Sequence, residues 1–519
     1  MLSVKNPIMT GFFPDPSICR VGNKFYTVHS TFAYFPGVPV FESEDLVHWN
    51  LISNVLDRDS QVPLSGCQHS QGIFAPTIRY HKGTWYMITT NVSDQGNFIV
   101  TAKDPRGPWS EPYYLGESTG GIDPSLFFDD DGTCYYIGQR PRSAGYRYNG
   151  DCEIWIQTLD LDTMQLKPDA TIVLTGFQRK AIWPEGPHLY KKDGYYYILH
   201  AESGTSIHHS VMIARSKNVF GPYEYCPCNP ILTHRHLGAQ YPVTCVGHAD
   251  LVDDGNGNWY MVVLACRPNQ GYTLLGRETF LAKVTWEDGW PVVNAGVGHL
   301  EEVTLPYEGQ PSDDVPQCKT YTFDTPSLPL ELLTLRNHRD HELELHAEEH
   351  IVRLFHRCDS LKDCGEPAYL ALRQQHWNCE FETSFIPHFC KESDCAGIAM
   401  VQSNENHLRA ECYPQDSGVK LVVSLCKDGK DSCLAQMDLP AALPIKLKLR
   451  VEGLVASVLY QSNSEWKPVI SDIDLRSLST EHAGGFVGCT LGLYASGNGE
   501  DAGGYSDFER MTYRELPTN

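Results

Sequence analysis

The sequence lacks any apolar run near the roughly 18 residues that a membrane-spanning helix needs, so we expect no membrane partner. Basic residues are also scarce: 41 Lys and Arg stand against 64 Asp and Glu, for a formal net charge of −23. A surface of this sign repels phosphate backbones, which argues against a nucleic-acid partner. Solubility is the ordinary explanation of such a charge.

Zinc-type cysteine spacing is absent as well. The 18 cysteines include no C-x-x-C pair, and the closest two are Cys226 and Cys228. The N-terminal stretch MLSVKNPIMTGFFPDPS has no basic region followed by a long apolar run, so it does not read as a secretory signal. We therefore expect free, buried thiols and a cytoplasmic, reducing location, with secretion as the alternative if a signal has been removed.

What the sequence does contain is a phrase repeated five times. Each copy has a short apolar strand, a polar turn that usually includes glycine, and an aromatic-rich strand, the pattern of a β-hairpin. The aliphatic residues that align the copies are Ile18, Ile78, Leu126, Leu189 and Leu251. Their intervals of 60, 48, 63 and 62 residues leave room for about four strands each. The repeat predicts an all-β fold that begins with a five-bladed β-propeller.

A second domain is expected after the propeller. The propeller would occupy residues 1–304, and a stretch rich in Pro, Asp and Gln at 305–320 reads as a linker. Residues 321–519 contain runs such as IKLKLRVEGLVASVLYQ, in which apolar and polar residues alternate with a period of two. This pattern predicts a two-sheet β-sandwich.

The repeat also brings acidic residues together, because equivalent positions of all blades meet at the axis of a propeller. Three residues before the five anchors lie Asp15, Ala75, Asp123, Gly186 and His248, and Glu185 is one residue further back in the fourth copy. Asp15 stands between two prolines, which leave its backbone little freedom. We therefore expect Asp15, Asp123, Glu185 and His248 to form one site.

Three clustered carboxyl groups suit glycoside hydrolysis. One carboxylic acid protonates the leaving oxygen, and one carboxylate activates water or attacks the anomeric carbon. A third carboxylate holds the pKa of the acid up by like-charge proximity. Acid and base can perform the whole reaction, so no cofactor is required.

The acidic motifs resemble those of a known family. FPDPS (13–17), GGIDPSLFFDDDG (120–132) and WPEGPHLYKKDGYYYI (183–198) are similar to the three acidic motifs of glycoside hydrolase family 43, the inverting β-xylosidases and α-L-arabinofuranosidases. The resemblance covers essentially the whole chain and implies a sandwich of the jelly-roll, concanavalin-like type. It also implies that Asp15 is the general base, Glu185 the general acid, and Asp123 the residue that tunes and orients the acid.

The resemblance extends to the pocket that would hold the sugar. The residues that it implies for substrate binding are His248, Arg277, Thr205, Phe32 and Phe74. Phe74 is a departure, because the family usually has tryptophan there. The segment EHAGGFVGCTLGLYAS (481–496) resembles one that brings a phenylalanine to the pocket mouth, which places Phe486 in the aglycone subsite. Asp324 and Asp507 resemble strand-end positions that hold a structural calcium ion, and ordinary turn aspartates are the alternative.

These observations predict an inverting exo-glycoside hydrolase, a β-1,4-xylosidase that releases xylose from the non-reducing ends of xylo-oligosaccharides and has α-L-arabinofuranosidase side activity. The alternative substrate assignment is a primary α-L-arabinofuranosidase that acts on arabinoxylan side chains. The motifs differ from those of the invertase group on the same architecture. An alternative of another class is a non-catalytic carbohydrate-binding propeller, although such a protein would not need all three acids. A homo-oligomeric state stays open.

Overall fold

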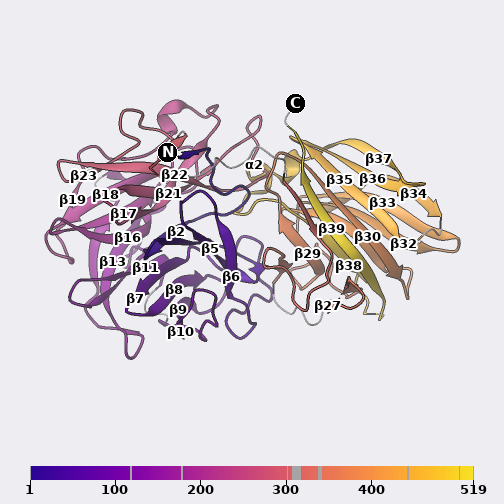
Figure 1. Cartoon of the computed structure of the whole chain (residues 1–519), viewed down its shortest axis with the longest axis horizontal. Coiled ribbons are helices and arrows are strands. Elements are labelled where there is room, and N and C mark those ends of the chain that lie inside the picture. Colours follow the sequence, from indigo (N-terminus) through magenta and orange to yellow (C-terminus); the bar gives the residue numbers. More distant parts are fainter. Residues whose placement is uncertain are drawn as a thin grey trace.

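The computed structural model describes residues 2–116, 120–176, 179–300, 302–306, 317–336, 342–440, 443–501 and 503–517. Its strands form two bodies that lie side by side, the first from β1 to β24 and the second from β25 to β39 (Figure 1). Helix is confined in the described chain to short turns such as η2 (Arg235–Leu237), η3 (Arg476–Leu478) and α2 (Thr480–Ala483). No helix of the described residues is long and apolar enough to cross a membrane. The expectation of an all-β protein is confirmed.

The described part of the first body contains five successive antiparallel sheets whose strands pair in chain order. The first sheet is β2 (Ser17–Val21), β3 (Lys24–Val28), β5 (Gly37–Ser43) and β6 (Asn50–Leu56). The second is β7 (Thr77–His81), β8 (Thr84–Asn91), β9 (Gly96–Ala102) and β10 (Tyr113–Tyr114). The third is β11 (Ile122–Phe128), β12 (Cys134–Pro141), β13 (Cys152–Asp160) and β14 (Gln165–Leu166), with β15 (Thr171–Thr175) also on β13. The fourth is β16 (Glu185–Lys192), β17 (Tyr195–Glu202), β18 (Ser210–Ser216) and β19 (Glu224–Tyr225). The fifth is β20 (Thr244–Asp253), β21 (Trp259–Cys266), β22 (Glu278–Glu287) and β23 (Trp290–Val293).

Each copy of the sequence repeat is the first hairpin of one of these sheets. The aliphatic anchors all lie in first strands and are at most 4% exposed: Ile18, Ile78, Leu126, Leu189 and Leu251. The start and the end of the first body are joined by pairing of β1 (Leu2–Val4) with β24 (Val303–Leu305). The repeat therefore predicted the position of one hairpin in each of these five sheets.

The second body has two sheets packed face to face. One described sheet has the order β27 (Leu343–His346), β28 (Ile351–Phe355), β39 (Tyr505–Glu515), β30 (Asn378–His388), β35 (Ile445–Glu452), β36 (Val455–Ser462) and β37 (Glu465–Asp474), with β25 (Cys318–Tyr321) also on β39. The other has the order β29 (Ala368–Arg373), β38 (Thr490–Ser496), β31 (Cys395–Val401), β32 (His407–Gln415), β33 (Gly418–Lys427) and β34 (Lys430–Pro440). The two-sheet sandwich that the alternating pattern predicted is present.

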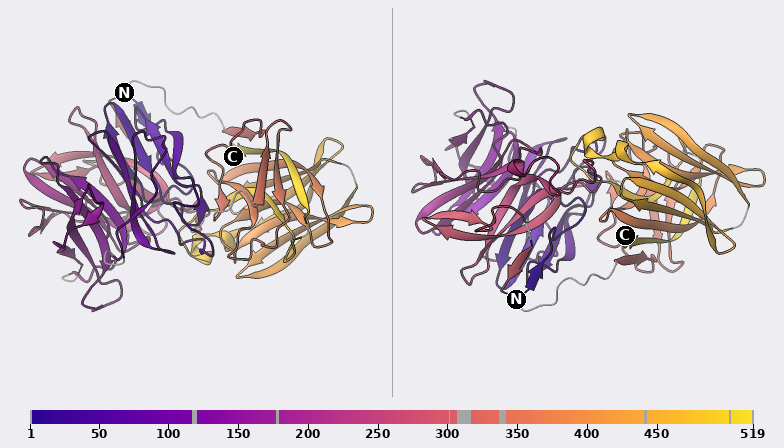
Figure 2. Two further views of the ribbon diagram at one scale, coloured as in Figure 1. Left: turned by 90° about the horizontal axis from the view of Figure 1, so that it is seen from below. Right: turned by 90° about the horizontal axis from the view of Figure 1, so that it is seen from above.

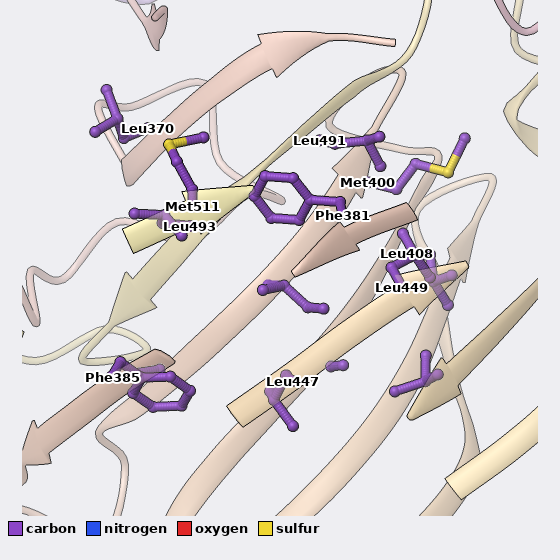
Figure 3. Packing of buried hydrophobic residues seen from close by; sticks show 14 of the residues in the cluster. Leu370, Phe381, Phe385, Met400, Leu408, Leu447, Leu449, Leu491, Leu493 and Met511 are labelled. Carbon is purple, nitrogen blue, oxygen red and sulfur yellow. The ribbon is translucent and has the colours of Figure 1, made fainter. Parts of the chain in front are cut away.

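The core of this sandwich is apolar and well covered (Figure 3). Phe381, Leu447 and Leu449 of one sheet meet Met400, Leu408 and Leu491 of the other, and all six are at most 2% exposed. Burial of one such side chain contributes about 1.5–3 kcal/mol to the free energy of unfolding. This rigid sandwich can hold a loop in a fixed place against the first body.

Several contacts join the two bodies, which also lie side by side in the views of Figure 2. β26 (Thr334–Leu335) pairs with β4 (Tyr34–Phe35) of the first body. The fully buried Arg336 donates from Nε to the Cys67 carbonyl at 2.7 Å and from Nη1 to the Gly365 carbonyl at 2.8 Å. Of the linker expected at 305–320, residues 307–316 lie outside the described residues.

Candidate active site

One cavity of about 530 Å³ collects all nine residues that the sequence proposed for catalysis and sugar binding. They are Asp15, Asp123, Glu185, Phe32, Phe74, Thr205, His248, Arg277 and Phe486. The acids and His248 lie at or just before the first strands of four sheets, and Phe486 comes from the second body. Residues up to 471 positions apart in the sequence, Asp15 and Phe486, thus face one space.

Backbone conformation aims these side chains. Asp15, Asp123 and His248 have φ values of 52°, 55° and 50°, in the left-handed region that non-glycine residues avoid. The pairing of β11 with β12 and of β20 with β21 shifts register at these points, as at a β-bulge, which redirects a side chain out of the sheet. Such strain costs of order 1–3 kcal/mol per residue and is concentrated at functional sites.

The fourth copy has glycine at the same position for a steric reason. Gly186 shares the left-handed conformation, with φ of 57°, and a Cβ there would lie 3.0 Å from the ring of His248. A carboxylate at position 186 would collide with that ring, and the acid of this copy is instead Glu185, one residue earlier. The Gly186 N–H donates a hydrogen bond to Asp123 Oδ2 at 2.9 Å.

Asp15 is held as a carboxylate. Ser30 Oγ donates to its Oδ2 at 2.6 Å, and Arg277 Nη1 donates to its Oδ1 at 2.8 Å. His248 Nδ1 lies 3.8 Å from the same Oδ1. Burial alone would raise the pKa of Asp15, but Arg277, His248 and the Ser30 hydrogen bond outweigh it and lower the pKa below its ordinary value.

Glu185 has the opposite character. Burial, followed by the negative charges of Asp123 and Asp15, raises its pKa well above the ordinary value. No described residue donates a hydrogen bond to its carboxyl group. Burial also raises the pKa of Asp123, with a contribution from Asp15. The cavity therefore contains a carboxyl group with a lowered pKa, Asp15, and one with a strongly raised pKa, Glu185, which is the difference that acid–base catalysis requires.

An aromatic wall closes one side of the cavity, where the second body meets the first. The Phe486 ring stacks on Phe32 with centroids 6.0 Å apart and meets the edge of Phe74 at 5.9 Å. Phe486 is placed by its backbone: its N–H donates to Ser70 Oγ at 2.9 Å, and its carbonyl accepts from Arg277 Nε at 3.4 Å. The sandwich thus completes the wall of the cavity.

The base of this loop is fastened to the first body through α2. Glu481 accepts hydrogen bonds from the Thr273 N–H at 2.6 Å and from Thr273 Oγ1 at 2.8 Å. Thr205, the remaining pocket residue proposed from the sequence, accepts from Arg277 Nη1 at 3.4 Å. Arg277 therefore contacts the carboxylate of Asp15, the pocket threonine and the loop of the second body.

A buried ion-pair cluster, which the sequence analysis did not identify, connects the first strands of the sheets. Asp250 accepts hydrogen bonds from Ser17 Oγ at 2.9 Å and from Tyr190 Oη at 2.5 Å, and Arg79 Nη1 lies 3.0 Å from its Oδ2. Arg79 Nη2 is 3.1 Å from His188 Nδ1. Burial would raise the pKa of Asp250, but Arg79, His188 and the hydrogen bonds lower it to about 2. The cluster ties four sheets together.

Other residues line the cavity without having been proposed, among them three with ring side chains: Tyr146, Trp183 and His209. Trp183 lies two residues before Glu185, so its place in the WPEGP motif could have identified it as a pocket residue from the sequence. Tyr146 is 65% exposed in the segment between β12 and β13, where no repeat marks it. His209 is buried, and burial lowers its pKa to about 4, so its ring is neutral at neutral pH.

The two aspartates expected to hold calcium lie elsewhere. Asp324 is exposed in the loop after β25, and the Asp507 carboxylate accepts from Arg353 Nε at 2.7 Å. Among the described residues, the one group of three potential metal ligands with donor atoms within 4.8 Å of one another is His407, Cys426 and Asp431. Calcium at Asp324 and Asp507 stays a prediction.

All 18 cysteines are free thiols, and ten of them, including Cys226, are buried.

Comparison with known proteins gives matches over both parts of the chain. Residues 4–291 match the family model of glycosyl hydrolases family 43, and residues 320–514 match that of the beta xylosidase C-terminal concanavalin A-like domain. The chain is 50% identical over 522 residues to a xylosidase/arabinosidase of Butyrivibrio fibrisolvens, with 99% of this chain and all of that protein covered. It is 37% identical to a non-reducing end α-L-arabinofuranosidase of Bacteroides ovatus, over 99% of this chain and 95% of that one.

A solved structure is similar throughout. The crystal structure of a xylan β-1,4-xylosidase from Bacillus halodurans superposes with a TM-score of 0.91 at 34% identity, over 99% of this chain and all of that one. The resemblance inferred from the acidic motifs is therefore confirmed over both parts of the chain. The chain belongs to glycosyl hydrolase family 43 and is a glycoside hydrolase with a concanavalin-like C-terminal domain.

Proposed function

We propose that this enzyme is an exo-acting β-1,4-xylosidase that also hydrolyses α-L-arabinofuranosides, with xylo- and arabinoxylo-oligosaccharides as substrates. The observation that carries the proposal is that one cavity, closed on one side by the second domain, contains Asp15, whose pKa is lowered, and Glu185, whose pKa is raised. Relatives whose names include xylosidase, arabinosidase and non-reducing end arabinofuranosidase support the same substrate classes.

The roles of the acids follow from their surroundings. Asp15, with a lowered pKa, accepts a proton from the attacking water, and Glu185, with a raised pKa, gives a proton to the leaving oxygen. Asp123 maintains the raised pKa of Glu185 by its negative charge. We expect inversion at the anomeric carbon, with the carboxyl groups of Asp15 and Glu185 about 6.5–9.5 Å apart so that water fits between them.

Exo action is supported by the blocked side of the cavity. An internal unit of a polymer needs a cleft that is open at both ends, whereas the rings of Phe32 and Phe74 close one side here and Phe486 lies at the rim of the opening. A terminal sugar would occupy the space beside Arg277, and the next unit would lie toward the exposed rings of Phe486 and Trp183. Aromatic faces of this kind pack well against the C–H faces of sugars.

We also propose that the five sheets of the catalytic domain are the blades of a closed five-bladed propeller. The first strands contact one another in a ring, β2 with β7, β7 with β11, β11 with β16, β16 with β20, and β20 again with β2. Such closure explains why four copies of the repeat contribute to one site.

The test compares p-nitrophenyl β-D-xylopyranoside with p-nitrophenyl α-L-arabinofuranoside, each at saturating and at low concentration. We expect the xyloside to have the higher kcat/KM, the arabinofuranoside to be hydrolysed as well, and Asp15→Ala to abolish both activities. Dominance of the arabinofuranoside would make the enzyme primarily a side-chain-removing arabinofuranosidase. Activity on neither compound would favour a carbohydrate-binding protein. Proton NMR of the first product tests inversion, which releases the α-anomer of xylose from a β-xyloside.

A further inference from the structure

A second cavity, of about 290 Å³, lies between the two domains and shares no lining residue with the catalytic cavity. The catalytic domain contributes the rings of Phe13, Phe41 and Trp49, and the concanavalin-like domain contributes Lys319, Arg373 and Tyr513. Arg373 is the last residue of β29, and Lys319 lies in β25. The proposed glycosidase activity uses none of these side chains.

Arg373 is the unusual member of this set. It is only 6% exposed, yet its guanidinium group makes no ion pair or hydrogen bond with any described residue. Its Nε and Nη2 atoms are fully buried without a partner. Buried arginines are ordinarily paired, because removing an uncompensated charge from water is expensive. Burial lowers the pKa of Arg373 to about 10, so the group still carries its charge at neutral pH.

Two aromatic rings hold this guanidinium in place. Its carbon atom lies 4.8 Å from the centroid of Phe12 and 4.6 Å from that of Phe13. Cation–π contacts are weak and do not replace a carboxylate partner. The two rings therefore orient the guanidinium group but leave its positive charge uncompensated.

The remaining charges of the cavity do not neutralise Arg373. Glu331 is the acidic residue of the lining, and its Oε1 lies 3.6 Å from Lys319 Nζ. Those two charges offset one another, which leaves the cavity with a net charge of about +1 from Arg373. In a protein of net charge −23, an interdomain cavity lined by one uncompensated guanidinium group is suited to an oxyanion.

We propose that this interdomain cavity binds a carboxylate carried on a single sugar-sized ring, such as a hexuronic acid. The carboxylate would accept a hydrogen bond from Nη1 of Arg373, the guanidinium nitrogen that is not among the fully buried unpartnered atoms, and the ring would pack against the aromatic side chains of Phe13, Phe41 and Trp49. The volume is at the lower limit for small-molecule sites and fits one ring rather than an oligosaccharide. The ligand would contact both domains.

The test is a ligand titration of the full chain at constant ionic strength. Binding is measured by isothermal calorimetry and by the change in the midpoint temperature of thermal unfolding. Sodium glucuronate supplies ring and charge, glucose supplies the ring alone, and acetate supplies the charge alone. We expect saturable binding and a raised midpoint with glucuronate, and at least tenfold weaker binding of glucose and of acetate. No saturable binding of glucuronate to the wild-type protein would overturn the proposal.

Variants locate the bound molecule. Arg373→Met should abolish glucuronate binding, while its midpoint without ligand stays equal to or above that of the wild type, because an unpaired buried charge is removed. Arg277→Met removes the arginine of the catalytic cavity and should leave the glucuronate response intact. Loss of the response in Arg277→Met with retention in Arg373→Met would place glucuronate in the catalytic cavity and refute the proposal.

Two more variants distinguish loss of a binding group from loss of folding. Arg373→Lys keeps the positive charge but replaces the planar guanidinium group, and it should weaken glucuronate binding at least tenfold. Arg353→Met is the matched control: Arg353 also lies over a ring, that of Tyr505 at 3.9 Å, but is paired with Asp507, and its loss should not change glucuronate binding. Unchanged binding in Arg373→Lys would count against the proposal. Because no turnover is measured, failure here is independent of failure of the proposed xylosidase activity.

Discussion

The imidazole of His248 lies against Gly186 so closely that a Cβ on that glycine would be 3.0 Å from the ring. The two residues occupy the same position of neighbouring copies of the repeat, and their contact decides which copy can hold a carboxylate there. The acid of the fourth copy moves back to Glu185, while the Gly186 N–H turns to Asp123. The spacing of the three acids thus depends on one small residue.

Gly186→Ala should therefore impair catalysis more than folding. The methyl group would push the His248 ring and strain a backbone with φ of 57°, so we expect kcat/KM to fall at least tenfold. Gly194→Ala is the matched control, since it lies in the following turn with φ of 73° and its Cβ would meet only Lys217 Nζ, at 3.8 Å. The control should lose about 1 kcal/mol of stability and keep its activity. Equal losses of activity in both variants would remove the steric explanation.

The pH dependence of kcat/KM should follow the two pKa shifts. The reaction needs Asp15 ionised and Glu185 protonated, so the rate falls in acid as Asp15 gains a proton and in alkali as Glu185 loses one. Arg277 lowers the pKa values of both groups. Arg277→Met should therefore move both limbs of the profile to higher pH, the acid limb by about one unit or more. If kcat/KM falls at every pH while both limbs stay at the same pH, this electrostatic role is excluded.

Glu185→Ala should separate substrates by their leaving groups. An aryl xyloside has a good leaving group and needs little protonation, whereas xylobiose needs the acid fully. We expect kcat on xylobiose to fall by roughly 10²–10⁴-fold and kcat on p-nitrophenyl xyloside to fall much less. Asp123→Ala should show the same preference to a smaller degree, because loss of its negative charge lowers the pKa of Glu185. Equal losses on both substrates in Glu185→Ala would show that another group is the acid.

The gathering of Asp15, Asp123, Glu185 and His248 could be predicted because a repeat converts sequence spacing into position in space. The pocket residues Phe32, Phe74, Thr205, Arg277 and Phe486 depended on the family resemblance, since no spacing rule connects them to the acids.

Other features could not be predicted from local patterns. The pair of Arg79 and Asp250 joins residues 171 positions apart, and nothing in either hairpin indicates that the two charges meet. Tyr146 belongs to an irregular segment, where side-chain direction is set by tertiary packing. The same holds for Arg373, whose lack of a partner becomes visible only when the two domains are placed together.

Asp250 should be a main contributor to the stability of the catalytic domain. Its carboxylate is fully buried and paired with Arg79, so Asp250→Asn leaves that guanidinium uncompensated and should lower the free energy of unfolding by about 3–5 kcal/mol. The folded-state pKa of about 2 lies below the ordinary 3.8, so the contribution is complete above pH 4 and is lost as the pH falls toward 2. Denaturant unfolding at pH 7 and at pH 3 tests this, and the difference between wild type and Asp250→Asn should shrink in acid.

The control for that measurement is Asp253→Asn. Asp253 lies on the same strand and pairs with Arg20, but its side chain is 43% exposed, so the variant should lose no more than about 1 kcal/mol. A loss in Asp250→Asn as small as in the control would mean that water or structural relaxation compensates Arg79.

Phe486→Ala should show whether the second domain completes the aglycone subsite. The backbone contacts of residue 486 with Ser70 and Arg277 survive this change, so only the ring is removed from the pocket wall. We expect KM for xylobiose to rise by up to about tenfold, the effect of losing one aromatic contact, while inhibition by free xylose changes little because xylose occupies the terminal subsite. Phe389→Ala, a half-buried ring of the same domain outside the cavity lining, should leave both constants unchanged. If xylose inhibition weakens as much as xylobiose binding, the Phe486 ring instead shapes the terminal subsite through its contacts with Phe32 and Phe74.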